Sequence, residues 1–197
     1  MNLPTIILLR HGETEWNIEG RYQGQLNSNL TNLGKEQALN NAFKIEREIC
    51  LNEPFKFFSS PLGRAKESTL IICEALGIES EKIIYEENLQ EVNYGIFEGK
   101  TKFFCQTKLK QQFNDREANK WEYVVNGGES YEMVTQRLLI WLKSIENEKN
   151  IIVVAHEMIN RALRGIYCKY AQEKILGLRQ SNDVVIKLEN SKEFIVE

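Results

Sequence analysis

Short apolar runs alternate with amphipathic segments along this 197-residue chain. Five runs rich in β-forming residues predict strands: TIILL at 5–9, FKFFS at 55–59, EKIIY at 81–85, IIVVA at 151–155 and DVVIKL at 183–188. The first and fourth are apolar without alternation. That pattern is typical of strands covered on both faces, as in a parallel sheet.

Helical patterns separate these runs. Thr31 is a good capping residue and predicts a helix to about Cys50. A second helix is expected from about Gly63 to Leu76, ended by Gly77. A third begins at Ser130, and a fourth follows His156. The apolar faces expected for the first and third helices are Leu39, Ala42, Phe43 and Ile49, and Val134, Leu138, Trp141, Leu142 and Ile145. The alternation predicts an α/β three-layer sandwich with a mostly parallel central sheet flanked by helices.

The segment 100–126 differs, because it is polar, rich in Lys and Gln, and studded with aromatic residues. We interpret it as a partly helical insertion or cap lying over a single domain that spans residues 1–197. Its aromatic residues are expected to pack onto the domain rather than line an apolar pocket. Its lysines could attract a second anionic group, but a solvated helix face is favoured. The residues concerned are Phe103, Phe104 and Trp121, and Lys100, Lys102, Lys108 and Lys110.

Composition narrows the function classes. A net charge of −3 leaves no electrostatic footprint for nucleic acid or an anionic membrane surface. The four cysteines have no metal-site or redox spacing, so reduced thiols are expected. The N-terminal apolar run is too short for a membrane span and lacks the basic flank of a signal peptide. We therefore expect a cytoplasmic protein, with monomer and homodimer both open.

The chain contains only two histidines, and each directly follows an apolar run. Ligands of open α/β sheets bind at the carboxyl ends of the strands, so His11 and His156 are expected to meet in one crevice. A lone histidine is more often structural, but two in equivalent places favour function. Two histidines without a matched carboxylate pair are a poor metal-ligand set, so no metal is expected.

The residues around His11 suit a tetrahedral oxyanion. A neutral imidazole is a good nucleophile toward phosphorus. The Arg10 guanidinium can bind phosphate oxygens bidentately. Gly12 would let the backbone approach a ligand closely, and Thr14 and Asn17 add hydrogen-bonding groups.

Two later segments could complete such a site. In SSPLGRAKEST, Arg64 lies near a helix N-terminus, which itself favours an anion. A solvated surface arginine is the plainer alternative. In LQEVNYGIFEGKT, Glu91 and Glu98 are candidate proton donors, since burial can raise a carboxyl pKa. For Glu98 a surface charge is the favoured interpretation.

With these residues assembled, the chain resembles the histidine phosphatase superfamily, which includes cofactor-dependent phosphoglycerate mutases. The matching segments are LLRHGETEWNIEGRYQGQLNSNLTNLGKEQA, SSPLGRAKEST, LQEVNYGIFEG, GGESYEMVTQR and VVAHEMINRALRG. They occur in the family's order and cover most of the chain except 100–126. The resemblance implies a phosphoglycerate mutase-like fold.

The resemblance also implies roles for individual residues. His11 would take up the phosphoryl group. Arg10, Arg64 and His156 would surround the phosphate, and Glu91 would protonate the leaving oxygen and then activate water. Asn17, Gln23 and Gly24 would line the phosphate and substrate site. Neither a metal nor an organic cofactor is implied, since phosphoryl transfer needs mainly positioning and charge neutralisation.

One position departs from the family pattern. Glu157 and Met158 follow the second histidine, where the family usually has glycine. A carboxylate there could repel a phosphate, or it could select substrates that carry a cation. We therefore count Glu157 among the candidate substrate-binding residues.

Three functions fit the resemblance. We favour hydrolysis of a small phosphate ester through a phosphohistidine on His11, because GRYQG and GGESYEMV resemble the phosphatase branch. A phosphoglycerate mutase is the alternative, although its insertion before the second histidine is longer. A catalytically silent module that binds phosphorylated ligands is the third function. Unchanged turnover in a His11 variant would exclude the phosphohistidine route of the first.

Overall fold

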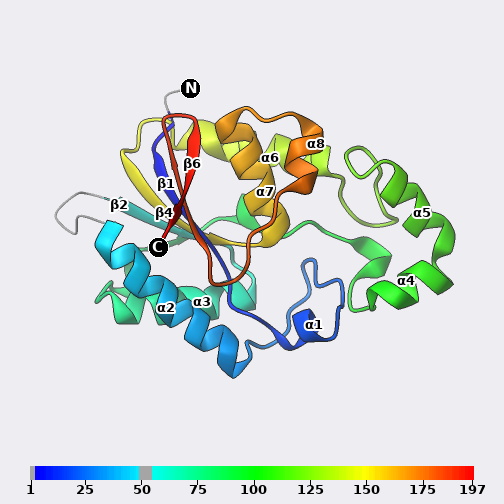
Figure 1. Cartoon of the computed structure of the whole chain (residues 1–197), viewed down its shortest axis with the longest axis horizontal. Coiled ribbons are helices and arrows are strands. Elements are labelled where there is room, and N and C mark those ends of the chain that lie inside the picture. Colours follow the sequence, from blue (N-terminus) through cyan, green and yellow to red (C-terminus); the bar gives the residue numbers. More distant parts are fainter. Residues whose placement is uncertain (1–2, 49–54) are drawn as a thin grey trace.

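A single mixed sheet forms the centre of the computed structural model, which describes residues 3–48 and 55–197 (Figure 1). Within these residues the strand order is β3-β2-β4-β1-β5-β6. The four strands β1 to β4 run parallel, whereas β5 and β6 are antiparallel additions at one edge. The strands are β1 (Thr5–Arg10), β2 (Phe55–Ser59), β3 (Ile83–Tyr85), β4 (Asn150–Ala155), β5 (Val185–Glu189) and β6 (Lys192–Val196).

The two central strands are buried on both faces, which explains why their sequences are apolar without alternation. In β1, Ile6 and Leu8 belong to one hydrophobic core, whereas Ile7 and Leu9 belong to the other. Strand β4 divides in the same way between its odd and even positions. Successive side chains of a strand point to opposite faces, so an uninterrupted apolar run supplies both cores at once.

Helices cover both faces of the sheet. Helices α2 (Asn32–Glu48) and α3 (Gly63–Ala75) pack on one face, and α6 (Tyr131–Ser144) and α7 (Glu157–Cys168) pack on the other (Figure 1). The three-layer α/β prediction is therefore confirmed. The shorter helices are α1 (Glu15–Ile18), α4 (Lys102–Lys108), α5 (Lys110–Ala118) and α8 (Gln172–Gly177), with 3₁₀ turns at Ser80–Lys82, Glu87–Leu89 and Gly95–Phe97.

Capping explains where the long helices begin. The hydroxyl of Thr31 accepts a hydrogen bond from the N–H of Gly34 at 2.9 Å, as predicted for the start of α2. The hydroxyl of Ser130 accepts from the N–H of Met133 at 3.2 Å and starts α6. Both bonds satisfy a backbone donor that has no partner within its own helix.

The predicted apolar face of α2 is only partly correct. The buried residues are Ala38, Ala42 and Ile45, whereas the side chains of Leu39 and Phe43 are exposed. The predicted face residue Ile49 and the predicted helix end at Cys50 lie outside the described residues. The buried positions 38, 42 and 45 recur three or four residues apart and so share one side of α2, while positions 39 and 43 are turned away from it. The α6 face, from Val134 to Ile145, is buried as predicted.

Strand boundaries also differ in detail. Glu81 and Lys82 belong to a 3₁₀ turn, so β3 is shorter than the predicted run 81–85. Strand β5 begins at Val185 rather than Asp183. Strand β6 was not predicted, because its exposed edge position needs no regular apolar pattern: Phe194 and Ile195 are both exposed.

The segment 100–126 forms α4 and α5, which lie beside the sheet domain (Figure 1). Of the three aromatic residues for which packing was predicted, only Trp121 packs, and its ring stacks on Tyr131 at 6.1 Å between centroids. Phe103 and Phe104 are exposed. Its interpretation as an insertion into a single domain stays a prediction.

Two further findings concern membrane-spanning helices and the cysteines. No helix within residues 3–48 and 55–197 is both long and apolar enough to cross a membrane. Cys73, Cys105 and Cys168 are free thiols.

A close backbone contact fixes the loop after β1. A Cβ on Gly12 would lie 2.0 Å from the carbonyl oxygen of Gly34, and a Cβ on Gly34 would lie 2.1 Å from that of Glu13. Gly12 is therefore needed to let the loop approach α2, a role that the sequence-based interpretation of Gly12 did not include.

The contact predicts that alanine will have different effects at two helical glycines. Gly34→Ala should lower the free energy of unfolding by about 2 kcal/mol, because backbone must shift to admit the methyl group. Gly177→Ala in α8 is the matched control, since nothing lies within 4 Å of its added Cβ. Urea denaturation of both variants measures the difference. Equal stabilities would contradict the close contact.

Candidate active site

The two histidines meet at the carboxyl ends of adjacent strands. Arg10 of β1 pairs with Ala155 of β4, and the N–H of His11 donates to the carbonyl of Ala155 at 3.0 Å. The imidazole rings of His11 and His156 consequently lie 5.1 Å apart between centroids, and both are buried. The predicted convergence of the two histidines is therefore present in the structure, although only His11 reaches the cavity wall.

A cavity of about 490 Å³ opens above these strand ends. Eight basic side chains and three carboxyl groups line it among the described residues. The charged lining residues are Arg10, Arg21, Arg64, Lys102, Arg116, Lys120, Arg161 and Arg179, with Glu91, Glu117 and Glu157. Such a surplus of cations favours an anionic ligand.

The hydrogen bonds of His11 determine which ring nitrogen is free. Its Nδ1 lies 2.7 Å from the carbonyl oxygen of Gly12, which can only accept, so Nδ1 carries the proton. Its Nε2 then holds a lone pair, and it accepts from the Nε–H of Arg64 at 3.2 Å. The nucleophilic nitrogen of the neutral ring therefore lies beside a guanidinium.

Backbone carbonyls hold Arg64 in this place. Its Nη1 donates to Leu26 O and its Nη2 donates to Gly24 O, both at 2.7 Å. The side chain is 1% exposed, and burial lowers the pKa of the guanidinium to about 10. Arg64 remains charged at neutral pH without a carboxylate partner, so its charge is available to a ligand.

His156 lies beneath the cavity rather than in its wall. Its Nε2 lies 2.8 Å from the hydroxyl of Ser60, and its Nδ1 is buried without a partner. The Ser60 hydroxyl also accepts from the N–H of Leu62, so it can donate its own hydrogen to Nε2. The proton of His156 would then sit on Nδ1, where a phosphate oxygen could accept it.

Burial and nearby arginines keep both rings neutral. The pKa of His11 lies well below the usual value, first because of burial and then because of the charges of Arg64 and Arg10. The pKa of His156 is lowered well below its usual value for the same reasons, burial and then Arg64. A neutral His11 is the form that can attack phosphorus.

Glu91 is a buried carboxyl group facing the same cavity. Burial raises its pKa, and hydrogen bonds and the charges of Arg64 and Arg10 only partly offset that effect. One carboxyl oxygen accepts from the N–H of Val92 at 2.9 Å, and the other accepts from the N–H of Met158 at 3.4 Å. A group held and shifted in this way can act as a proton donor.

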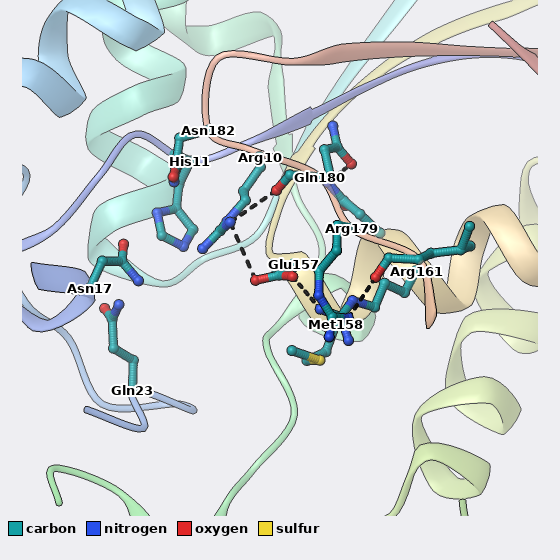
Figure 2. A network of polar contacts seen from close by, with 12 residues as sticks. Arg10, His11, Asn17, Gln23, Glu157, Met158, Arg161, Arg179, Gln180 and Asn182 are labelled. Atoms are coloured by element: carbon teal, nitrogen blue, oxygen red, sulfur yellow. Dashed lines mark hydrogen bonds and ion pairs between the residues drawn. The ribbon is translucent and has the colours of Figure 1, made fainter. Parts of the chain in front are cut away.

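Asn17, Gln23 and Gly24 line the cavity, whereas Thr14 lies behind it. The buried Thr14 hydroxyl accepts from the side-chain amide of Gln23 at 2.8 Å and from the N–H of Asn17. Thr14 thus positions two lining residues instead of facing a ligand. Figure 2 shows Asn17 and Gln23 on one side of His11 and Glu157 on the other.

Glu98 is neither a proton donor nor a free surface charge. Its carboxylate accepts from the N–H of Gln25 at 2.9 Å and from the N–H of Tyr94 at 3.0 Å. A Cβ on Gly24 would lie 1.8 Å from the same carboxylate. Glu98 therefore ties the loop at Gly24 to the segment after Glu91, and both earlier interpretations are corrected.

Comparison with known proteins shows the family to which this chain belongs. The family model of the histidine phosphatase superfamily, branch 1, matches residues 6–195. The chain belongs to this superfamily. Phosphoserine phosphatase 1 of Hydrogenobacter thermophilus is 31% identical over 200 residues, covering 93% of this chain and 90% of that protein. The family match confirms the predicted superfamily, and relatives such as this phosphatase support the predicted phosphatase branch.

Other relatives differ in length or similarity. Human 6-phosphofructo-2-kinase/fructose-2,6-bisphosphatase 1 is 30% identical over 184 residues, and the match covers 93% of this chain but only 37% of that protein. The alpha-ribazole phosphatase of Shigella flexneri has a TM-score of 0.81 at 19% identity, with 97% and 94% of the two chains covered. That second similarity supports the fold alone.

Several residues that shape this histidine phosphatase site were not found from sequence. The amide of Asn182 donates to His11 O at 2.7 Å, and Gln180 O accepts from Nη1 of Arg10 at 2.9 Å. Ser68 accepts from the N–H of Gly12 at 3.0 Å. The polar run RQSND before an apolar strand was the one signal for the first two. Arg116 and Arg161 carried no spacing that pointed to the cavity.

The four lysines of the segment 100–126 for which an anion-binding role was considered have different surroundings. Lys102 lines the cavity, whereas Lys100 donates to Ile96 O and Lys108 and Lys110 are exposed. For metals, no group of three or more His, Cys, Asp or Glu in the described parts of the chain lies close enough to hold an ion. Metal-independence stays a prediction.

Proposed function

We propose that this histidine phosphatase hydrolyses the phosphate monoester of a small metabolite that carries a second anionic group. The observation that supports it best is the hydrogen-bonding of His11. Because Gly12 O takes the Nδ1 proton, the Nε2 lone pair lies beside the Arg64 guanidinium, at the place where a phosphate would bind.

In the first step, Nε2 of His11 attacks phosphorus. A P–N bond forms, the ester P–O bond breaks, and Glu91 gives its proton to the leaving oxygen. Arg10 and Arg64 offset the charge on the phosphoryl oxygens, and Nδ1–H of His156 would donate to one of them. In this type of reaction, positioning and charge neutralisation account for most of the rate acceleration.

In the second step, the Glu91 carboxylate takes a proton from water while the water oxygen attacks phosphorus. The P–N bond breaks, and its electron pair returns to Nε2. Inorganic phosphate leaves and Glu91 is protonated again. One carboxyl group with a raised pKa can serve both steps, because it is an acid in the first and a base in the second.

The cavity supports the second anionic group. Arg10 and Arg64 would bind one phosphate group. Further cationic side chains line the cavity wall on the side of α4 and α5. Arg116 is the best placed of them, because it is buried and its guanidinium lies 5.2 Å from the ring centroid of Tyr94 and 5.9 Å from that of Tyr22. The rings hold the guanidinium in position, while the carboxylate of Glu117, 3.1 Å from its Nη1, offsets part of its charge.

The first test of the proposal is phosphate release from p-nitrophenyl phosphate in excess EDTA. The wild-type protein should release phosphate, and His11→Ala should lower kcat by about 10⁴-fold or more, because the nucleophile is lost. Trapping of labelled phosphate as an acid-labile adduct should succeed only with His11 present. Turnover that survives in His11→Ala contradicts the phosphohistidine route.

Glu91→Gln should affect substrates according to their leaving group. The loss of kcat should be about 10²–10⁴-fold for an alkyl phosphate, whose leaving oxygen needs a proton, and smaller for p-nitrophenyl phosphate.

In the wild type, activity should fall as pH rises through the raised pKa of Glu91, since the acid form is required. It should persist well below pH 6.5 because the pKa of His11 is lowered.

A pH profile of kcat/KM measures both limbs. The alkaline fall should disappear in Glu91→Gln while the acid limb stays. An alkaline limb that is unchanged in the variant contradicts the role given to Glu91.

Arg116→Gln tests the second anionic group. KM for phosphoserine or phosphoglycerate should rise about tenfold, as expected for one lost charge-assisted hydrogen bond, while KM for p-nitrophenyl phosphate should change little. Arg47→Gln on the exposed side of α2 is the matched control. An equal rise for both kinds of substrate would contradict recognition of a second anion.

The two alternative functions give distinct results in these assays. A mutase converts 3-phosphoglycerate to 2-phosphoglycerate with little phosphate release. A silent binding module binds phosphate esters but forms no adduct on His11.

A further inference from the structure

Glu157, the residue that departs from the family pattern, makes two ion pairs in the cavity. One carboxylate oxygen lies 3.3 Å from Nη1 of Arg10. The other accepts from Nη2 of Arg161, one turn further along α7. Figure 2 shows Glu157 between the two arginines, with His11 on the far side of Arg10. The carboxylate therefore links a phosphate-binding arginine to a second arginine.

The bonds of Arg10 show what this link does. An Nη1 group has two hydrogens, and here one faces Gln180 O at 2.9 Å and the other faces Glu157. The Nε–H of Arg10 is buried and has no partner. Glu157 and Gln180 thus occupy one end of the guanidinium and leave its Nε–Nη2 edge, which can bind two phosphate oxygens side by side.

The charge of Glu157 is balanced in place. Its carboxylate has an arginine on each side and stands in the first turn of α7, where the helix dipole favours an anion. A carboxylate balanced in this way has little charge left to repel a phosphate or to attract a substrate cation. Both roles that the sequence left open for Glu157 fit these contacts poorly.

We infer that Glu157 is a positioning residue that aims the Nε–Nη2 edge of Arg10 at the phosphate, and that Arg161 keeps Glu157 from competing for Arg10. This inference rests on the proposed function, since it assigns Arg10 to phosphate binding. Arg161 acts on the phosphate through Glu157, not as a contact of the substrate.

Kinetics and phosphate binding test the inference together. Glu157→Gln keeps an acceptor but loses the charge, so KM for p-nitrophenyl phosphate and the inhibition constant of inorganic phosphate should both rise about fivefold. Glu157→Gly, the family's residue, should raise both about tenfold or more because the Arg10 side chain is freed. Glu173→Gln in α8 is the control, because its exposed carboxyl group does not line the cavity.

The pair with Arg161 gives a result that general loss of structure would not. Arg161→Gln leaves the Glu157 charge to Arg10 alone, so phosphate should bind more weakly than in the wild type. Adding Glu157→Gln should then restore part of the phosphate affinity. A double variant that binds phosphate worse than either single variant would overturn the inference, and would instead make Arg161 a substrate contact.

Other outcomes are equally decisive. Tighter phosphate binding in Glu157→Gln would show that the carboxylate repels the substrate, and unchanged constants in Glu157→Gly would remove any role for it. Both results leave the proposed function intact if wild-type turnover still depends on His11. A wild-type protein that neither binds inorganic phosphate nor turns over esters contradicts the proposed function and the inference with it.

Discussion

The parallel pairing of β1 with β4 is the constraint on which the site depends. It places the two strand ends side by side, so residues 145 positions apart in the chain, His11 and His156, come within ring-contact distance. The burial of both strands on both faces fixes their register, because a shift by one residue would exchange the two cores. The apolar runs that stabilise the sheet therefore also determine the geometry at its edge.

The electrostatics of the cavity follow from how its arginines are held. Arg64 bonds to two backbone carbonyls, and Arg10 bonds to one carbonyl and shares Glu157 with Arg161. Carbonyl oxygens fix a guanidinium without cancelling its charge. The cavity consequently stays strongly positive in a chain whose net charge is −3, and burial strengthens each of these interactions.

The sequence predicted those features that depend on local chemistry and regular periods. The apolar runs of β1 and β4, the caps at Thr31 and Ser130, and the histidines after the strands could all be found in this way. The edge strand β6 and the exposed positions of Leu39 and Phe43 could not, because they depend on what lies beside each element. Thr14 and Glu98 were misread for the same reason: a polar residue near a motif can serve the motif from behind, and only tertiary contacts separate the two cases.

The hydrogen bonds that hold Arg10 and His11 in place affect when the site can form during synthesis of the chain. The carbonyl of Gln180 that holds Arg10 is 170 residues away in sequence, and the amide of Asn182 that holds His11 is 171 residues away. A ribosome releases the N-terminal strand long before it has made these partners. The nascent chain can therefore carry every phosphate-binding residue of its first motif and still lack the scaffold that aims them, until the loop before β5 docks.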